Sequence, residues 1–130
     1  MVHATLGEAP YRVDIEAGGH QLVADEGPAL GGGNVGPGPF ELVLSGLAAC
    51  TLITLRMYGE RKQWPTLGLS VKLRHRVEDG RHLIDREVEV TGAPDDAGVA
   101  RLRDIAERTP VTLALKAGFA ISTVLNPVTV

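Results

Sequence analysis

The feature that most constrains the fold is a long apolar segment that follows a glycine- and proline-rich loop. Residues 39–61, PFELVLSGLAACTLITLRMYGER, begin with Pro39, which suits the first position of a helix because its missing N–H costs nothing there. Apolar side chains occur on nearly every side of the helix that this segment would form. Such a helix is buried on most sides. In a chain of 130 residues, we expect one of those sides to need a partner subunit.

Composition and charge narrow the class of protein. The length suits one ordinary domain, and we take residues 1–130 as a single domain. Hydrophobic residues make up 44% and charged residues 22%, as in soluble globular proteins. The net charge of −3 gives no general electrostatic reason to bind nucleic acid or an anionic membrane. The start of the chain does not resemble a signal peptide, and polar residues interrupt the longest apolar run, so we expect a cytoplasmic protein without a membrane span.

Residues before and after the long helix predict strands joined in hairpins. Alternation of apolar and polar side chains indicates strands at 11–17, 20–25, 68–77 and 82–92. The last two are joined by Asp79-Gly80, which is a strong signal for a hairpin turn.

Two shorter helices and a closing strand complete the predicted order of elements. One helix begins near Asp95, and another begins at Pro110, where the Thr109 hydroxyl can cap it. Residues 119–125 indicate a closing strand. The order ββαββααβ, with its strands in hairpins, predicts an α+β fold.

The glycine-rich loop ALGGGNVGPGPFEL ends at a helix, so phosphate binding has to be considered. It lacks the Gly-Lys-Ser/Thr ending of a P-loop, and it does not give a GxGxxG spacing after a buried strand. We therefore interpret it as a turn-rich connection. No motif in the chain indicates a cofactor.

The histidines and one arginine are weaker candidates for a functional role. The four histidines have no short metal-ligand spacing, and we predict no metal site from them: His3, His20, His75 and His82. The last two flank the predicted hairpin turn, where they can face each other, but we favour surface residues. Arg86 interrupts the apolar side of its strand and is expected to point inward, where an arginine needs a carboxylate or a ligand anion. A structural ion pair is the favoured interpretation.

Cys50 is the only cysteine, so the chain has no internal disulfide and no metal site built on paired cysteines. Buried cysteines are common and usually inert, and a position in the middle of a helix gains little from the N-terminus of that helix. Gly46 and Thr54 lie on the same helical face as Cys50. The glycine opens space beside the sulfur, and the threonine offers a hydroxyl. A structural and a reactive role both remain open.

The segment ADEGPALGGGNVGPGPFELVLSGLAACTLITLRMYGERKQWP resembles the OsmC/Ohr family, in particular its OsmC-like branch. The later segment RLRDIAERTPVTLALKAGFAISTVL resembles the closing section of that family, so the resemblance covers nearly the whole chain. It implies an OsmC-like fold, with antiparallel sheets wrapped around a long central helix. It also implies an intertwined homodimer with active sites at the subunit interface, in a bacterial protein of oxidative-stress defence.

Family members of the peroxidase type reduce organic hydroperoxides with one cysteine, and a second cysteine then resolves the sulfenic acid. Cys50 matches the first cysteine. The resolving cysteine normally stands in a Cys-Pro-Val triplet, whereas this chain has Thr109-Pro110-Val111. The family's glutamate directly follows the proline eleven residues before the cysteine, a place that Phe40 occupies here. Glu41, a candidate catalytic residue, comes one position later and falls near the opposite helical face from Cys50, so it can replace that carboxylate only if the helix start is irregular.

An arginine that stabilises the thiolate in these peroxidases comes from an early strand motif, and Arg12 matches it poorly. The leading hypothesis is a one-cysteine thiol peroxidase that uses an organic hydroperoxide and an external thiol reductant. Phe40, Gly46 and Thr54 would form its substrate pocket. The alternative is a non-catalytic protein that binds a hydrophobic or thiol-bearing small molecule and has lost the redox pair.

Overall fold

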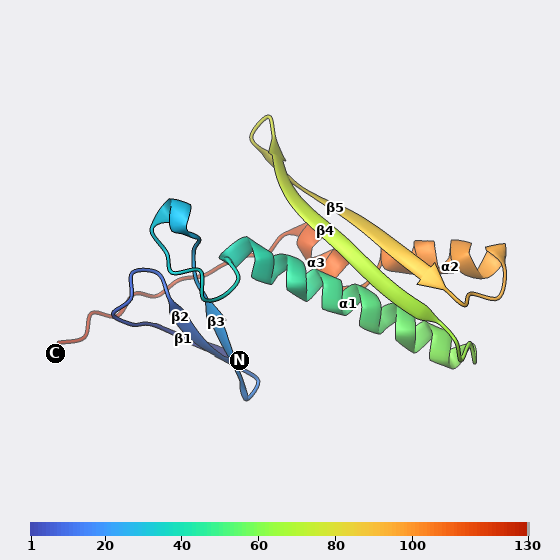
Figure 1. Ribbon diagram of the computed structural model, residues 1–130, viewed down its shortest axis with the longest axis horizontal. Coiled ribbons are helices and arrows are strands. Elements are labelled where there is room, and N and C mark those ends of the chain that lie inside the picture. The colour runs from blue at the N-terminus through green and yellow to red at the C-terminus, as the bar shows by residue number, and fades with distance from the viewer. Residues whose placement is uncertain (130) are drawn as a thin grey trace.

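The computed structural model describes residues 1–129 and has the mixed α+β architecture that the sequence predicts. One antiparallel sheet has the strand order β1-β2-β3, and the other is the hairpin β4-β5. The three-stranded sheet lies at one end of the molecule, and the hairpin runs beside the long helix (Figure 1). The elements in chain order are β1 (Val2–Leu6), β2 (Val13–Ala17), β3 (His20–Ala24), a short 3-10 turn (Pro28–Leu30), α1 (Pro39–Arg61), β4 (Gly68–Glu78), β5 (Arg81–Thr91), α2 (Asp96–Ala106) and α3 (Pro110–Ala117).

Helix α1 has the bounds that the sequence predicts. Pro39 occupies its first turn, and the Glu41 carboxylate accepts a 2.9 Å hydrogen bond from the backbone N–H of Gly38. A single stripe is buried within the chain, formed by Leu47, Thr51, Leu55 and Gly59. Four large apolar side chains of the helix remain 44–55% exposed: Phe40, Val43, Ile53 and Met57. One chain therefore covers only one side of a helix that is apolar almost all round.

The β4–β5 hairpin confirms the predicted turn. Val77 pairs with His82, and both Asp79 (φ 51°) and Gly80 (φ 75°) adopt the positive φ values of a tight hairpin turn. The hairpin packs on α1 and, with α2, encloses a small core formed by Leu55, Leu67, Leu102 and Ala106. Val88 and Val90 of β5 pack against this core.

Both short helices begin as the sequence predicts. The Asp95 carboxylate caps α2 by accepting a 2.7 Å hydrogen bond from the N–H of Gly98. The Thr109 hydroxyl caps α3 by accepting from the N–H of Thr112 at 3.4 Å. The Asp95 cap fixes the start of α2, and the Thr109 cap lies where the short α2–α3 connection ends. Both helices contact α1.

Two strand assignments differ from the sequence prediction. Strand β1 was not predicted, although its sequence VHATL alternates apolar and polar residues; it pairs with β2, and its residues are all exposed. The predicted closing strand at 119–125 is wrong, because this segment has no regular structure and pairs with no strand in the described chain. Its apolar side chains are exposed, including Ile121, Val124 and Leu125. A strand forms only beside a neighbour, and sequence alternation cannot show whether one is present.

The glycine-rich loop between β3 and α1 folds back on itself. The buried Asp25 carboxylate accepts hydrogen bonds from the backbone N–H groups of Glu26 and Val35. At Gly32 a Cβ atom would lie 2.0 Å from the carbonyl oxygen of Glu26, so close backbone approach requires glycine there. The loop is therefore a compact connection, as the sequence analysis favoured.

We expect Asp95→Ala to lower the free energy of unfolding by about 1 kcal/mol, because it removes the cap of α2. Urea unfolding followed by circular dichroism would measure the change. Arg103→Ala is a suitable control, since Arg103 is an exposed position of the same helix. Equal stability of the Asp95 variant and the wild type would contradict the capping role.

Candidate functional site

Cys50 lies half-buried on α1, facing the start of α3. The backbone N–H of Val111 donates a hydrogen bond to its sulfur, with a nitrogen–sulfur distance of 3.5 Å. The Thr54 hydroxyl, one turn along α1, lies 3.9 Å from the sulfur. Cys50 is too far along α1 to benefit from the N-terminus of its own helix. The N-terminus of α3 supplies the donor instead.

The surroundings of Cys50 shift its acidity. Burial raises the pKa of the Cys50 thiol and is the largest single influence on it. Several groups lower the pKa, in decreasing order: the Val111 N–H, the hydroxyls of Thr109 and Thr54, and the positive charge of Arg86. Together they outweigh burial, so the pKa of Cys50 lies below its ordinary value. A thiol of lowered pKa is more often present as the nucleophilic thiolate.

Thr109 is completely buried beside this thiol. Its hydroxyl lies 2.6 Å from that of Thr112, and it also caps α3. The side chain that stands in the resolving-cysteine position of the family pattern therefore contacts the Cys50 site and keeps its structural role. A hydroxyl at this place cannot form a disulfide.

Arg86 of β5 points inward, as the sequence predicts, but the predicted ion pair is wrong. Its Nη1 donates to the hydroxyls of Thr51 and Thr112, each at 2.9 Å, and its Nη2 donates to the carbonyl of Ala106 at 2.8 Å. Within residues 1–129, no carboxylate lies within ion-pair distance of Arg86. The nearby Glu107 carboxylate is held by Lys116 at 2.7 Å instead, and this contact lowers the pKa of Glu107. Neutral acceptors thus hold the arginine.

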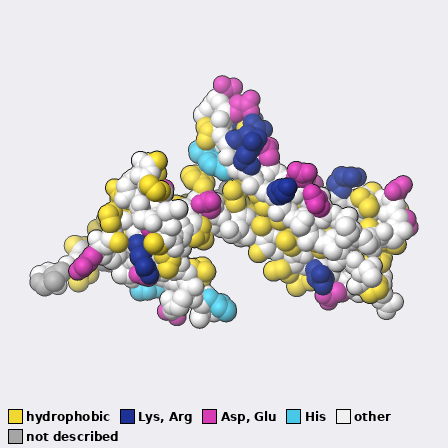
Figure 2. Space-filling view, in the orientation of Figure 1, with side chains coloured by type: hydrophobic (Ala, Val, Ile, Leu, Met, Phe, Trp, Pro, Cys, Tyr) yellow, Lys and Arg dark blue, Asp and Glu magenta, His cyan; other side chains and the backbone are white. Residues whose placement is uncertain are grey.

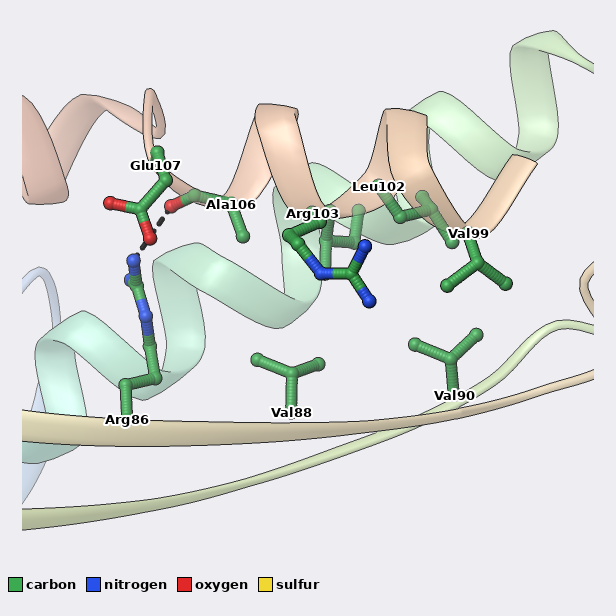
Figure 3. A pocket seen from close by; sticks show the side chains of 9 residues that line it. Arg86, Val88, Val90, Val99, Leu102, Arg103, Ala106 and Glu107 are labelled. Atoms are coloured by element: carbon green, nitrogen blue, oxygen red, sulfur yellow. Dashed lines mark hydrogen bonds between the residues drawn. The ribbon is translucent and has the colours of Figure 1, made fainter. Parts of the chain in front are cut away.

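A cavity of about 220 Å³ lies on the α2 side of Arg86. Figure 3 shows Val88 and Val90 of β5 facing Val99 and Leu102 of α2 across it. The Arg103 side chain reaches into the same space, and a dashed line joins Arg86 to the Ala106 carbonyl at one end. Cys50 does not line this cavity. The cavity and the thiol are separate features that share Arg86 as a boundary.

Of the other predicted site residues, Gly46 lies on the same face of α1 as Cys50, whereas Glu41, Phe40 and Arg12 make contacts elsewhere. Beside Gly46 there is open space, because a Cβ atom built there would meet nothing within 4 Å. The Glu41 carboxylate is engaged at the start of α1. Phe40 lies about 15 Å before Cys50 along the helix and stacks on His75 with ring centroids 4.2 Å apart. Arg12 pairs with its neighbour Asp14 on β2.

The two hairpin histidines face each other, as the sequence allowed. Nε2 of His75 and Nδ1 of His82 are 2.8 Å apart, and the two rings lie within 1° of parallel. His82 is exposed, whereas His75 is half-buried and stacks on Phe40. They join the tip of the hairpin to the start of α1.

Sequence reasoning missed two groups at the Cys50 site. The Val111 donor belongs to the backbone, and no side-chain pattern can indicate a backbone donor. Arg86 was recognised as inward-facing, but its link to Cys50 depends on contacts with residues twenty or more positions away. The break in the apolar alternation of β5 was the one available signal.

A family model described as OsmC-like protein matches residues 31–124, which is most of the chain. The chain belongs to the OsmC-like protein family. No curated protein matches it significantly.

Solved structures with the same fold are distant in sequence. An OsmC-like protein from Mycoplasma pneumoniae is 22% identical, with a TM-score of 0.69 over 89% of this chain and 86% of that one. A protein from Psychrobacter arcticus, described as a putative osmotic stress induced and detoxification response protein, is 14% identical, with a TM-score of 0.71 over 86% and 85%. An organic hydroperoxide resistance protein OsmC from Legionella pneumophila is 18% identical, with a TM-score of 0.63 over 89% and 88%. At these identities the likeness shows the fold alone.

We expect Thr109→Cys to fold and, under mild oxidant, to form a disulfide with Cys50, because Thr109 is buried beside the sulfur. Loss of the cap should cost about 1 kcal/mol. Mass spectrometry of non-reduced peptides would detect the linked pair. Ser45→Cys, at an exposed position of α1, is the control that should give no bond to Cys50 within one chain. If the Thr109 variant shows no such bond, Thr109 is not placed to substitute for a resolving cysteine.

Proposed function

We propose that this protein is a thiol-dependent peroxidase that reduces organic hydroperoxides through Cys50 alone. The observation that carries the proposal is the set of donors around the sulfur, led by the Val111 N–H at the start of α3. They favour the thiolate, and the open space beside Gly46 leaves room for a reactant on the same helical face. Membership of the OsmC-like family and the fold shared with the organic hydroperoxide resistance protein from Legionella pneumophila support this class of reaction.

The proposed reaction takes place in two stages. The Cys50 thiolate attacks one peroxide oxygen, the O–O bond breaks, and a proton is taken up as the alcohol leaves, so that Cys50 becomes a sulfenic acid. An external thiol then condenses with the sulfenic acid, releasing water and forming a mixed disulfide. A second external thiol displaces Cys50 and completes the reduction. The external thiol therefore reacts with the sulfenic acid in place of a resolving cysteine.

A second candidate function is non-catalytic binding of a small apolar molecule. The cavity between β5 and α2 favours it, because its walls are mainly valine and leucine and it does not require a reactive thiol. In that case Cys50 would remain reduced under excess peroxide. The two functions can therefore be separated by one oxidation experiment.

We further propose that the protein works as a cytoplasmic homodimer, with α1 at the subunit interface. Figure 2 shows hydrophobic side chains exposed around the middle of the molecule, and the exposed residues of α1 include Val43, Ile53 and Met57. By length and composition α1 could also cross a membrane, a property that the central helix of a soluble assembly shares. The exposed apolar residues at 119–125 offer a further segment for a second copy to cover.

With a thiol reductant present, we expect the wild type to consume an organic hydroperoxide and Cys50→Ser to lose that activity. In the absence of reductant, brief exposure should leave a sulfenic acid on Cys50 that a dimedone-type probe traps, because the chain has no second thiol. Prolonged exposure should instead give sulfinic and sulfonic acids and irreversible loss of activity. Peroxide assays and intact-mass spectrometry would follow both.

Two other outcomes of this experiment are informative. A disulfide between Cys50 residues of two subunits would mean that the thiols meet at the interface. Cys50 that stays reduced in excess peroxide would contradict the peroxidase function and leave the binding function in its place.

Ile53→Asp should weaken the proposed dimer, because it places a carboxylate on the exposed apolar face of α1. Sedimentation velocity at micromolar concentration should show a dimer for the wild type and a larger monomer fraction for the variant. Lys72→Asp, at an exposed position of β4, should sediment as the wild type does. A folded, monomeric wild type would overturn the dimer proposal.

A further inference from the structure

Arg86 joins the two segments that meet at the Cys50 sulfur. The sulfur belongs to Cys50 on α1, and its backbone donor belongs to Val111 on α3. One nitrogen of Arg86, Nη1, donates to both Thr51 and Thr112 at 2.9 Å. These are the residues that directly follow Cys50 and Val111. A single guanidinium nitrogen therefore spans the α1–α3 junction next to the sulfur–amide contact.

The second nitrogen of Arg86 fixes the element before α3. Nη2 donates at 2.8 Å to the carbonyl of Ala106, the last residue of α2. Carbonyls at the end of a helix lack partners within the helix, and a cation is favourable there. Because only a short connection separates Ala106 from Pro110, holding this carbonyl also holds the start of α3.

We propose that Arg86 is a positioning residue that sets the Val111 N–H against the Cys50 sulfur. It acts through Thr51, Thr112 and the Ala106 carbonyl and does not touch the sulfur. The inference rests on the proposed function in that Cys50 is the reactive thiol. It assigns the control of that thiol to Arg86, the residue that interrupts the apolar pattern of β5.

The shape of the side chain accounts for an arginine at this place. A planar guanidinium holds donors on separate nitrogens in fixed directions, so it can serve three acceptors on three helices at once. A lysine carries the same charge on one flexible nitrogen and cannot reproduce this arrangement. All three acceptors of Arg86 within residues 1–129 are neutral, so geometry is the main feature that the contacts share.

The test compares Arg86→Lys and Arg86→Met with the wild type and with Arg103→Met. Arg103 reaches into the cavity beside Arg86 (Figure 3), but its side chain makes no hydrogen bond within residues 1–129, which makes it a matched control. The first readout is the rate of iodoacetamide alkylation as a function of pH, which reports one site because Cys50 is the only thiol. The second is the amide proton shift of Val111 in nitrogen–proton correlation spectra.

We expect both Arg86 variants to alkylate several-fold more slowly than the wild type at neutral pH and to match it at alkaline pH. The pKa of Cys50 is then higher in the variants, because the sulfur has lost a well-placed donor. The Val111 amide proton should move upfield in both variants, and Arg103→Met should change neither readout. Full recovery by Arg86→Lys would mean that charge alone matters and would overturn the positioning role. An unchanged Arg86→Met would overturn it as well.

Thr51→Val keeps the test decisive if the Arg86 variants do not fold. It removes one acceptor of Arg86 with little change in shape and leaves the charge in place. We expect the same direction of change at Val111 and in the alkylation profile, and no change would count against the proposal. Neither readout uses peroxide, so failure of the peroxidase function and failure of the Arg86 role give different results.

Discussion

The hydrogen bonds of Arg86 hold together the parts of the chain on which the site depends. They connect β5 to all three helices: to Thr51 of α1, Ala106 of α2 and Thr112 of α3. A half-buried charge without a carboxylate is costly unless its donors find acceptors. The network meets that condition with two hydroxyls and a carbonyl. These acceptors come from α1, α2 and α3. The guanidinium of Arg86 therefore has its hydrogen-bond partners only when the three helices are packed together, and its hydrogen bonds in turn hold the helices in that arrangement.

Thr109 keeps a structural role at the position where the family resemblance implies a resolving cysteine. Threonine and cysteine are similar in size, and the hydroxyl caps α3 and contacts Thr112. The space beside Cys50 therefore stays filled by a polar side chain. What changes is the fate of an oxidised sulfur, because a hydroxyl cannot accept the sulfenyl group and end the oxidation as a disulfide.

Elements that depend on neighbouring residues were predicted from the sequence. Features that depend on contacts between distant segments were not. The start of α1 at Pro39, the Asp79-Gly80 turn and the Thr109 cap depend on neighbouring residues, and all three were predicted. The strand at 119–125 depends on a partner that the described chain does not provide, and that prediction was wrong.

The site follows the same division between local and distant contacts. Cys50 and its helical neighbour Thr54 could be identified from their spacing. The Val111 donor is a backbone group from another helix, and the partners of Arg86 are set by tertiary packing. The local sequence pattern indicates neither of these contacts. Its only signal is that Arg86 interrupts the apolar side of β5.

The compact loop before α1 has a consequence for anions. Loops that cradle phosphate do so with backbone N–H groups that point outward and have no other acceptor. Here most of those donors already have acceptors within the loop or beside it: Glu26 and Val35 donate to the Asp25 carboxylate, Leu30 and Gly32 to the Gly27 carbonyl, Gly31 to the Pro28 carbonyl, Asn34 to the Glu26 carbonyl and Gly38 to Glu41. The loop has glycine because its backbone passes close to itself, and that same closeness leaves it with few donors for a phosphate group.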